Sequence, residues 1–371
     1  MSAGEPIPLA RPALGDAEIA AAERALRSGR LVLGPEVERF EAGLAARTGR
    51  RHAIAVGSGT AALELALWVL GVGAGDEVLV PSFGFPAAAN AVRARGASAV
   101  PVDVEAATWN LDPASVRAAL GQKSRAIVSI DQFGLVAEAE PIAELAASNG
   151  LELIDDAACA LGATSAGGVP GGGYGVLGTL SFHPRKLVTT GEGGAVLCDD
   201  AALAAELRKL RNHGQSAPGR FERLGTNARL SEVAAAVGSA QLERLDTALA
   251  ERRLLAEGYR RRLAPLAAAG RISWQESPAG AMHAYQTFAT RLAPDLDRGA
   301  VRAALAAAGI ESGPATYAFH RLPSYAGIAR PVPLAESDAL HEGSLALPLY
   351  LGMRSAELDR VCDALTGAMT P

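Results

Sequence analysis

The residue best suited to covalent chemistry in this sequence is Lys186. It is one of only three lysines, beside Lys123 and Lys209, among 35 lysine and arginine residues. A primary amine can form a Schiff base with a carbonyl group, which a guanidinium cannot do. Lys186 lies in the stretch 179–194, with hydroxyl side chains upstream and a Gly-Glu-Gly-Gly turn downstream. The same residues are compatible with an ordinary surface lysine in a glycine-rich turn, so other parts of the sequence are needed to distinguish the two interpretations.

A turn that could bind an anion lies between a short apolar run and an apolar helix. The sequence Gly57-Ser-Gly-Thr60 follows residues 53–56 and opens a predicted helix in which Leu63, Leu67 and Leu70 share one face. Free amide groups and the positive dipole end at such a helix start favour a phosphate. An ordinary strand-to-helix turn explains the pattern equally well.

Three aspartates come directly after or at the end of apolar runs that predict strands. They are Asp103, Asp131 and Asp156. Because the carboxyl ends of parallel strands share one edge of a sheet, ligands gather there. Each of these side chains could instead cap a helix, and this is the interpretation we prefer for Asp103 and Asp131.

Predicted strands and helices alternate regularly in the first half of the chain. The strand candidates that precede helical patterns are residues 53–56, 77–81, 99–103, 126–130 and 151–154. This alternation predicts the α/β fold class with a mostly parallel central sheet. Near Asp246 a long arginine-rich helix begins, followed by strand candidates at 271–274 and 284–292. We therefore expect a large domain at 1–248 and a smaller C-terminal α+β domain at 249–371.

Composition and charge indicate which partners and which cellular compartment to expect. A net charge of −5 and a pI near 5.8 give no electrostatic reason to expect nucleic acid or an anionic membrane as partner. The three cysteines are widely spaced, which suits reduced thiols in a cytoplasmic protein better than disulfides or a metal site. The first residues lack a basic patch followed by an apolar core, and no long apolar run occurs. We expect neither a signal peptide nor a transmembrane span.

Several short motifs occur in a fixed order along nearly the whole chain. They are residues 31–35 (Leu-Val-Leu-Gly-Pro), 57–63 (Gly-Ser-Gly-Thr-Ala-Ala-Leu), 80–85 (Val-Pro-Ser-Phe-Gly-Phe), 156–158 (Asp-Ala-Ala), 181–186 (Ser-Phe-His-Pro-Arg-Lys), 191–194 (Gly-Glu-Gly-Gly), 211–214 (Arg-Asn-His-Gly), 227–232 (Asn-Ala-Arg-Leu-Ser-Glu) and 347–350 (Leu-Pro-Leu-Tyr). Any one of them is weak, but their joint order and spacing are specific. The chain resembles the DegT/DnrJ/EryC1/StrS group of fold-type-I pyridoxal-phosphate enzymes. Most of that group are aminotransferases acting on nucleotide-linked keto-sugars.

The resemblance implies one site for pyridoxal 5'-phosphate. Lys186 matches the lysine that binds this cofactor covalently and afterwards shuttles a proton. Asp156 matches the carboxylate paired with the pyridine nitrogen, whereas its neighbour Asp155 is expected to be structural. The further cofactor contacts that the motifs imply are Ser58, Gly59, Thr60, Phe85, Cys159, Ser181 and Asn227. Phe85 matches the aromatic that stacks on the ring, with Phe83 as the alternative if the alignment slips by two residues.

The resemblance also implies partners. Asn227 matches a residue that reaches the phosphate from a neighbouring subunit, which implies a homodimer with shared active sites. The guanidinium group of an arginine can bind a diphosphate through two parallel hydrogen bonds. The candidate substrate contacts are Arg185, Arg229, Tyr317, His320 and Arg321.

Three positions depart from the family pattern. Cys159 stands where glutamine or histidine is common, Gly84 where threonine is common, and Asp131 where histidine often occurs. A thiol is a weak hydrogen-bond partner, so a usual contact near the cofactor's O3' would be missing or come from elsewhere. We expect these changes to reflect drift more than altered substrate handling.

The function that the resemblance implies is amino transfer. An amino acid, with glutamate expected, would donate nitrogen to a keto group on a nucleotide-linked sugar or a cyclitol. One alternative is a sugar dehydratase of the same family, but those enzymes carry histidine in place of the lysine, so Lys186 argues against it. The other is a regulatory protein that keeps the fold without turnover. It predicts erosion of the cofactor residues, which are present here.

Overall fold

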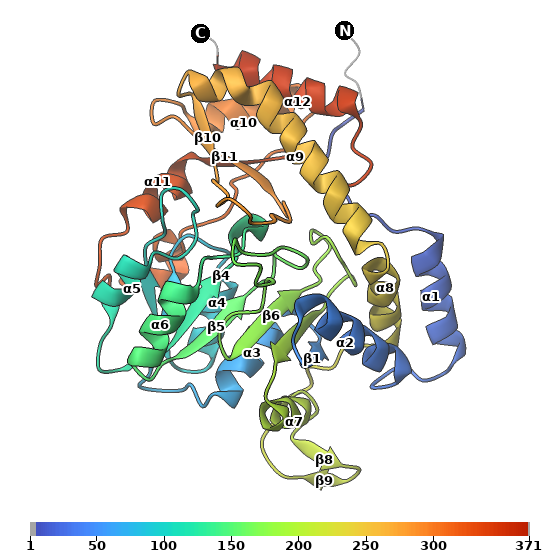
Figure 1. The fold of residues 1–371 in the computed structure, drawn as a ribbon. Coiled ribbons are helices and arrows are strands. Elements are labelled where there is room, and N and C mark those ends of the chain that lie inside the picture. Colours follow the sequence, from blue (N-terminus) through green and yellow to red (C-terminus); the bar gives the residue numbers. More distant parts are fainter. Residues whose placement is uncertain (1–4, 370–371) are drawn as a thin grey trace.

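The computed structural model describes residues 5–369, and its largest feature is a seven-stranded sheet (Figure 1). Its strand order is β1-β7-β6-β5-β4-β2-β3. Strand β7 runs antiparallel to both neighbours, and the remaining adjacent pairs are parallel. The strands are β1 (His52–Val56), β2 (Glu77–Pro81), β3 (Ser98–Val102), β4 (Ser124–Ile130), β5 (Glu152–Asp156), β6 (Leu177–Ser181) and β7 (Gly194–Cys198). The predicted α/β class with a mostly parallel sheet is confirmed.

Helices cover both faces of this sheet because strand side chains alternate in direction. Leu79 packs into one apolar layer, and its neighbours Val78 and Val80 pack into the other. The layer with Leu79 contains α2 (Pro35–Thr48), α5 (Pro113–Ala119), α6 (Glu140–Ser148) and α8 (Glu232–Leu242). The opposite layer contains α3 (Gly59–Val69), α4 (Ala87–Ala94) and α7 (Ala201–Leu210). This sandwich holds the carboxyl ends of the parallel strands along one edge.

Helix α1 (Asp16–Arg27) forms an outer layer on α8. The buried apolar residues of its contact are small, Ala21 and Ala25, whereas Ile19 and Leu26 remain exposed. A hairpin of β8 (Gln215–Ala217) and β9 (Arg220–Phe221) projects from the body after α7 (Figure 1).

A second, antiparallel sheet lies in the C-terminal part of the chain. It consists of β10 (Ile272–Trp274), β11 (Phe288–Leu292) and β12 (Ser344–Leu347). Two of these fall on the predicted strand candidates, and β12 was not predicted. The helices packed around it are α9 (Leu245–Ala268), α10 (Arg298–Ala307) and α12 (Ser355–Met369), with α11 (Ala335–Gly343) beside β11 and β12.

The long helix α9 connects the two parts of the chain (Figure 1). Its first turn contributes Leu245 and Leu249 to the core of the large sheet, and further along Tyr259 and Leu263 join the core of the small one. The expected domain boundary near residue 248 lies inside this helix, and the division into two domains stays a prediction. Ile7 pairs with Ile310 and packs into the core of the small sheet, so the N-terminal segment also contacts the C-terminal part. Within residues 5–369 no helix is both long and apolar enough to cross a bilayer.

Candidate active site

Lys186 lies in the connection between the antiparallel strands β6 and β7. A turn forms there because the Lys186 amide donates to the carbonyl of His183 at 2.8 Å. The side chain is half-buried, and its Nζ donates to the Sγ of Cys159 at 3.0 Å. Cys159 follows β5, which is paired in parallel with β6. The contact therefore joins two loops at the same edge of the sheet.

Asp156 is the last residue of β5 and lies at that edge. Its Oδ1 accepts hydrogen bonds from the Thr179 hydroxyl at 3.1 Å and from the amide of Ala158 at 3.2 Å. Burial raises the pKa of Asp156, while the charge of Lys186 and both hydrogen bonds lower it. A buried carboxylate of this kind is best stabilised by a cationic partner.

The two other carboxylates nearby have structural partners. Asp155 points to the opposite face of the sheet from Asp156, as strand alternation requires, and accepts from the amide of Tyr174 at 3.1 Å. Asp131 accepts from the amide of Ala137 at 2.9 Å, and its Oδ2 is buried without a hydrogen-bond partner. Burial raises the pKa of Asp155 to about 7 and that of Asp131 well above its usual range. Both groups therefore hold protons more tightly than exposed aspartates.

Of the two strand-end aspartates that were expected to cap a helix, only Asp103 does so. Asp103 accepts from the amides of Glu336 and Ser337, at 3.0 and 2.8 Å, and so binds the start of α11. Asp131 precedes a single helical turn but its side chain makes no cap there, so that expectation is wrong. Its carboxylate turns inward to Ala137 instead.

The turn before α3 forms a cradle against Ser181. The Ser58 hydroxyl caps the helix by accepting from the amide of Ala61 at 3.0 Å. A Cβ on Gly59 would lie 2.7 Å from the Cβ of Ser181, so only glycine fits this close approach. The helix start at Gly59 and Thr60 and the Ser181 hydroxyl thus meet at one point, a favourable place for a phosphate.

The structure separates the two candidate aromatic residues. Phe83 is buried and packs edge-on against Phe133, with ring centroids 6.1 Å apart. Phe85 is 67% exposed. Phe85 is therefore free to stack on a ligand, whereas Phe83 belongs to a core cluster.

Gly84 between them occupies a tight position. A Cβ there would lie 3.0 Å from the Cδ1 of Ile130 and 3.4 Å from the Nε2 of Gln132. The Gly84 amide donates to the carbonyl of Tyr317 at 2.8 Å. Glycine at this position lets the loop pack closely against both the sheet edge and the C-terminal part of the chain.

A cavity of about 600 Å³ opens beside the lysine loop. Arg185 and Tyr317, two of the candidate substrate contacts, line it, together with Arg302 and Glu311. Arg185 also lines a smaller adjoining cavity with Lys186. The large cavity is therefore next to the lysine, and it presents two guanidinium groups and an aromatic ring.

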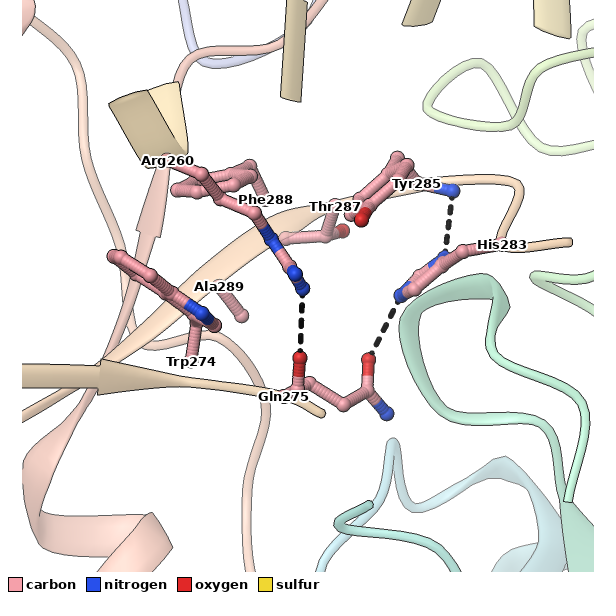
Figure 2. Close-up of a pocket in the computed structure, with 8 residues that line it drawn as sticks. All are labelled: Arg260, Trp274, Gln275, His283, Tyr285, Thr287, Phe288 and Ala289. Carbon is pink, nitrogen blue, oxygen red and sulfur yellow. Dashed lines mark hydrogen bonds between the residues drawn. The ribbon is translucent and has the colours of Figure 1, made fainter. Parts of the chain in front are cut away.

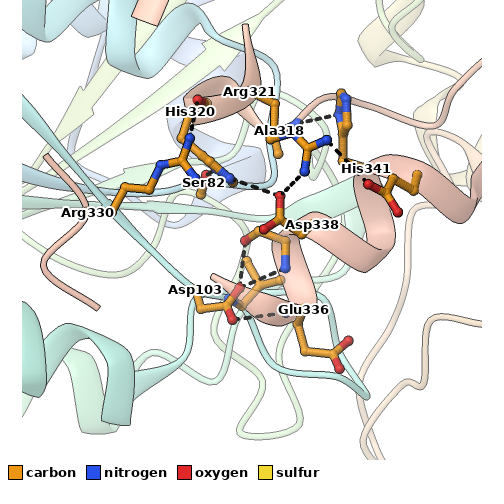
Figure 3. Close-up of polar contacts among 12 residues, drawn as sticks. Ser82, Asp103, Ala318, His320, Arg321, Arg330, Glu336, Asp338 and His341 are labelled. Carbon is orange, nitrogen blue, oxygen red and sulfur yellow. Dashed lines mark hydrogen bonds and ion pairs between the residues drawn. The ribbon is translucent and has the colours of Figure 1, made fainter. Parts of the chain in front are cut away.

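The other three candidate substrate contacts do not line this cavity. His320 is buried, hydrogen-bonds to the Ser82 hydroxyl, and lies 3.1 Å from Asp338 (Figure 3). Arg321 pairs with the same carboxylate at 2.9 Å. The serine–histidine–aspartate arrangement resembles a hydrolase triad, but Ser82 is fully buried and cannot reach a substrate. This network connects the loop after β2 to α11.

The remaining candidates lie near the end of β1. Arg229 donates to the Oδ1 of Asn212 at 2.6 Å, and its backbone bridges to Val56. Asn227 is exposed. Its neighbour Ala228 accepts from the amide of Gly57, which places this segment beside the phosphate turn.

A second polar cluster, around His283, is structural. Figure 2 shows Arg260 donating to the carbonyl of Gln275, whose Oε1 faces the Nε2 of His283 at 3.0 Å. The Nδ1 of His283 accepts from the amide of Tyr285, so Nε2 carries the proton. Burial and the surrounding arginines lower the pKa of His283 to about 3. The cavity here is about 10 Å³, which is room for no more than one water molecule.

A family model matches residues 12–366, and its description is the DegT/DnrJ/EryC1/StrS aminotransferase family. The chain belongs to this family. The expectation drawn from the motifs is thus confirmed across nearly the whole chain.

Named relatives include two sugar-modifying enzymes. GDP-perosamine synthase of Caulobacter vibrioides is 38% identical over 337 residues, or 90% of each chain. The dTDP-3-amino-3,4,6-trideoxy-alpha-D-glucose transaminase of Streptomyces venezuelae is 39% identical over 93% of this chain and 90% of its own. A pleiotropic regulatory protein of Geobacillus stearothermophilus is 33% identical over 92% of both chains.

Solved structures agree in fold. S. venezuelae DesV superposes with a TM-score of 0.91 at 35% identity, covering 99% of this chain and 100% of its own. The PLP form of a putative sugar aminotransferase from Streptococcus pneumoniae gives 0.91 at 26% identity over 98% of both chains. The protein is a pyridoxal-phosphate-dependent aminotransferase with the fold-type-I architecture.

The residues fit this cofactor. Asp156 offers a buried carboxylate to a protonated pyridine nitrogen, and the Gly59–Ser181 cradle is closed to any larger side chain. Arg302 and Glu311 were missed by the sequence analysis. No local signal marks them, because Arg302 is one of many helical arginines and its place in the cavity depends on long-range packing.

Proposed function

We propose that this aminotransferase moves an amino group from an amino acid, with glutamate as the donor, to a keto group of a nucleotide-linked sugar. The observation that carries the proposal is the cavity beside the Lys186 loop. Its volume of about 600 Å³ lies within the range of small-molecule sites. Arg185 and Arg302 supply two guanidinium groups for a diphosphate, and Tyr317 supplies a ring and a hydroxyl. The names of the two sugar-modifying relatives support the same substrate class.

When bound, pyridoxal phosphate supplies a carbonyl for the amino group and a ring that accepts the electron pair left by proton removal. In the proposed mechanism, Lys186 would hold the cofactor covalently, and its amine would become free when the amino donor binds. The free Nζ of Lys186 would then be the base that takes the proton from the substrate carbon and the acid that gives it back. Lys186 lines the smaller cavity, which shares Arg185 with the large one, and this position would let one amine serve donor and acceptor in turn.

The remaining residues hold the group in place. Asp156 would keep the ring nitrogen protonated, and the Thr179 hydroxyl fixes the orientation of that carboxylate. The amides of Gly59 and Thr60 and the hydroxyls of Ser181 and Ser58 would bind the phosphate, and the Ser58 hydroxyl also caps α3. The exposed side chain of Phe85 would pack against the cofactor ring.

We propose further that the active form is a homodimer in which Asn227 of each chain contacts the phosphate site of the other. The support is the exposed apolar surface near this residue. Val32 bridges to Ser231, which brings the exposed Leu31 and Val32 beside the loop with Asn227. Phe221 and Leu224 are 63% and 83% exposed just before it. Such surfaces mark protein interfaces. Free cysteines throughout residues 5–369 support a cytoplasmic location.

A regulatory role without turnover is a second candidate, favoured by the name of the Geobacillus relative. The presence of Lys186, Asp156 and the adjoining cavity argues against this role. A regulatory protein without turnover needs no lysine that can form and break a covalent bond to the cofactor. A regulatory protein would bind the cofactor yet fail to convert any amino donor.

The experiment that tests the proposal follows visible absorbance and product mass. The purified protein with pyridoxal phosphate should show a visible band, which Lys186→Ala abolishes while circular dichroism shows an intact fold. Glutamate should change the band, and a nucleotide-linked keto-sugar should restore it and yield an aminated product by mass. An unchanged visible band in Lys186→Ala would overturn the role assigned to Lys186. Conversion of a cyclitol ketone, without conversion of any nucleotide-linked sugar, would overturn the proposed substrate class.

The cavity itself is tested by two arginine variants. Arg185→Ala and Arg302→Ala should raise KM for the nucleotide-linked sugar roughly 10-fold or more, the loss expected for a charged hydrogen bond. The glutamate half-reaction should change little, because the donor has no diphosphate. Arg117→Ala, exposed on α5, is the matched control and should leave both values unchanged.

A further inference from the structure

The contact between Cys159 and Lys186 places a thiol beside the amine that reacts with the cofactor. The two atoms are 3.0 Å apart in a partly buried position. Each residue follows one of two adjacent parallel strands, so the sheet edge fixes the approach of their loops. The distance is short enough for a bond to form between sulfur and nitrogen after small side-chain rotations.

The other two thiols have different surroundings. Cys198 is fully buried in β7, and burial raises its pKa to about 11. Cys362 is 4% exposed in α12, and burial raises its pKa to about 12. Both stay protonated at neutral pH, and a protonated buried thiol reacts slowly with oxidants. Cys159 is half-buried, so it is more accessible to a small oxidant than the other two thiols, and its sulfur contacts the amine of Lys186.

We propose that Cys159 and Lys186 form a reversible redox switch, in which oxidation by hydrogen peroxide joins the two side chains through a sulfur–nitrogen bond. The bond occupies the nitrogen that the cofactor needs. Oxidant would therefore turn off cofactor binding, and a reducing thiol would turn it on again.

The chemistry balances in two steps. The Cys159 thiolate attacks the peroxide, an S–O bond forms as the O–O bond breaks, and water leaves after proton uptake, so sulfur is oxidised to a sulfenic acid. The Lys186 amine then attacks this sulfur, an S–N bond forms, the S–O bond breaks, and a second water leaves. The pair loses two hydrogen atoms in total, and one peroxide is reduced to two waters.

Reversal uses thiol exchange. A thiolate attacks the Cys159 sulfur, the amine of Lys186 leaves with a proton, and a second thiol releases the mixed disulfide. When Lys186 is bonded to the cofactor its nitrogen cannot attack sulfur. The cofactor and the cross-link therefore exclude each other, whatever the acceptor sugar is.

The test uses the full chain, with and without pyridoxal phosphate, treated with hydrogen peroxide. For the cofactor-free protein we expect an intact-mass loss of two hydrogens and a digest in which the peptides containing residues 159 and 186 are joined. Dithiothreitol should separate them. The fraction cross-linked should equal the fraction that no longer takes up cofactor, and preloaded protein should form no joined peptide.

Two variants make the result decisive. Cys159→Ser keeps the size of the side chain and should give no joined peptide, while Cys198 and Cys362 serve as internal controls that stay reduced. Lys186→Arg should stop the oxidation at an acid on Cys159. Sulfinic acid without joined peptides in the unaltered chain, or equal oxidation of all three cysteines, would overturn the switch. Because this mass readout involves no substrate, its failure is distinguishable from failure of the proposed amino transfer.

Discussion

The Thr179 hydroxyl donates a hydrogen bond to Asp156 at 3.1 Å across the paired strands β5 and β6. The two residues are direct partners in the strand register. Thr179 is buried and its side chain points to the same face of the sheet as that of Asp156. The orientation of the Asp156 carboxylate is thus fixed by a neighbouring strand.

Replacing this hydroxyl should weaken cofactor binding. Thr179→Val removes a hydrogen bond to a charged group, worth about 1.5–3 kcal/mol, so cofactor affinity should fall roughly 10- to 100-fold. Thr179→Ser keeps the donor and should restore most of the affinity. Titration of visible absorbance with pyridoxal phosphate measures both. Equal affinity in the valine and serine variants would show that the hydroxyl does not position Asp156.

A methyl group in the phosphate cradle should have a similar effect. Gly59→Ala places a Cβ 2.7 Å from the Cβ of Ser181, which forces the turn away from the phosphate. We expect loss of cofactor affinity with little loss of folding stability, measured by absorbance titration and thermal unfolding without cofactor. Gly367→Ala on α12, where a Cβ would meet nothing within 4 Å, is the matched control. Unchanged affinity in Gly59→Ala would contradict the cradle.

The buried Asp155 should make stability depend on pH. Burial raises its pKa to about 7, so between roughly pH 4 and 7 the folded protein holds a proton that the unfolded chain releases. The contribution of Asp155 to the free energy of unfolding is therefore largest at low pH and is lost as the pH rises through 7. Asp155→Asn cannot ionise and its amide oxygen can still accept from Tyr174.

Urea unfolding at pH 5 and pH 8 measures this effect. The gain in unfolding free energy from Asp155→Asn should be larger at pH 8 than at pH 5. Asp131 stays in both proteins, but its pKa is raised by burial and also by the charge of Asp155, so Asp155→Asn reduces the contribution of Asp131 to the pH dependence in the same direction. Asp16→Asn, exposed on α1, should change neither value. A gain that is the same at both pH values would refute the raised pKa.

The exposed loop before α2 offers a test of the dimer. The double substitution Leu31→Glu and Val32→Glu should convert the dimer to monomers, because burying two unpaired carboxylates in an interface is costly. Analytical ultracentrifugation measures the change. Cofactor affinity should fall as well, since Asn227 could no longer reach the second chain. Leu254→Glu, a change at another exposed leucine on α9, is the control. A dimer that survives the double change would place the interface elsewhere.

The parts of the fold that were predictable depend on short-range patterns. Strand and helix alternation predicted five of the seven strands of the large sheet, β1 to β5, because each unit carries its own apolar period. The motifs around Lys186 and Asp156 were recognisable because each belongs to a single loop or strand end. A cap at Asp103 was foreseen from its residue type, but the helix that it binds starts more than 230 residues later. No local pattern encodes that pairing.

The parts that were not predictable depend on packing between distant segments. The contact of Cys159 with Lys186 requires β5 and β6 to be neighbours. His320 was a candidate substrate contact, yet it faces Ser82 and Asp338 in a buried network. The cavity wall joins Arg185 to α10 and to the segment 309–317. Such surfaces arise from tertiary structure, which composition and periodicity do not specify.

The N-terminal segment has a practical consequence for protein engineering. Pro6 and Leu9 line the large cavity, and the amide and carbonyl of Ile7 bond to Gly309 and Glu311. A truncation that removes these residues would take away one wall of the cavity. The C-terminal helix α12 packs into the core of the small sheet and contributes no residue to that wall. Affinity tags and fusion partners are therefore better joined after α12 than ahead of Pro6.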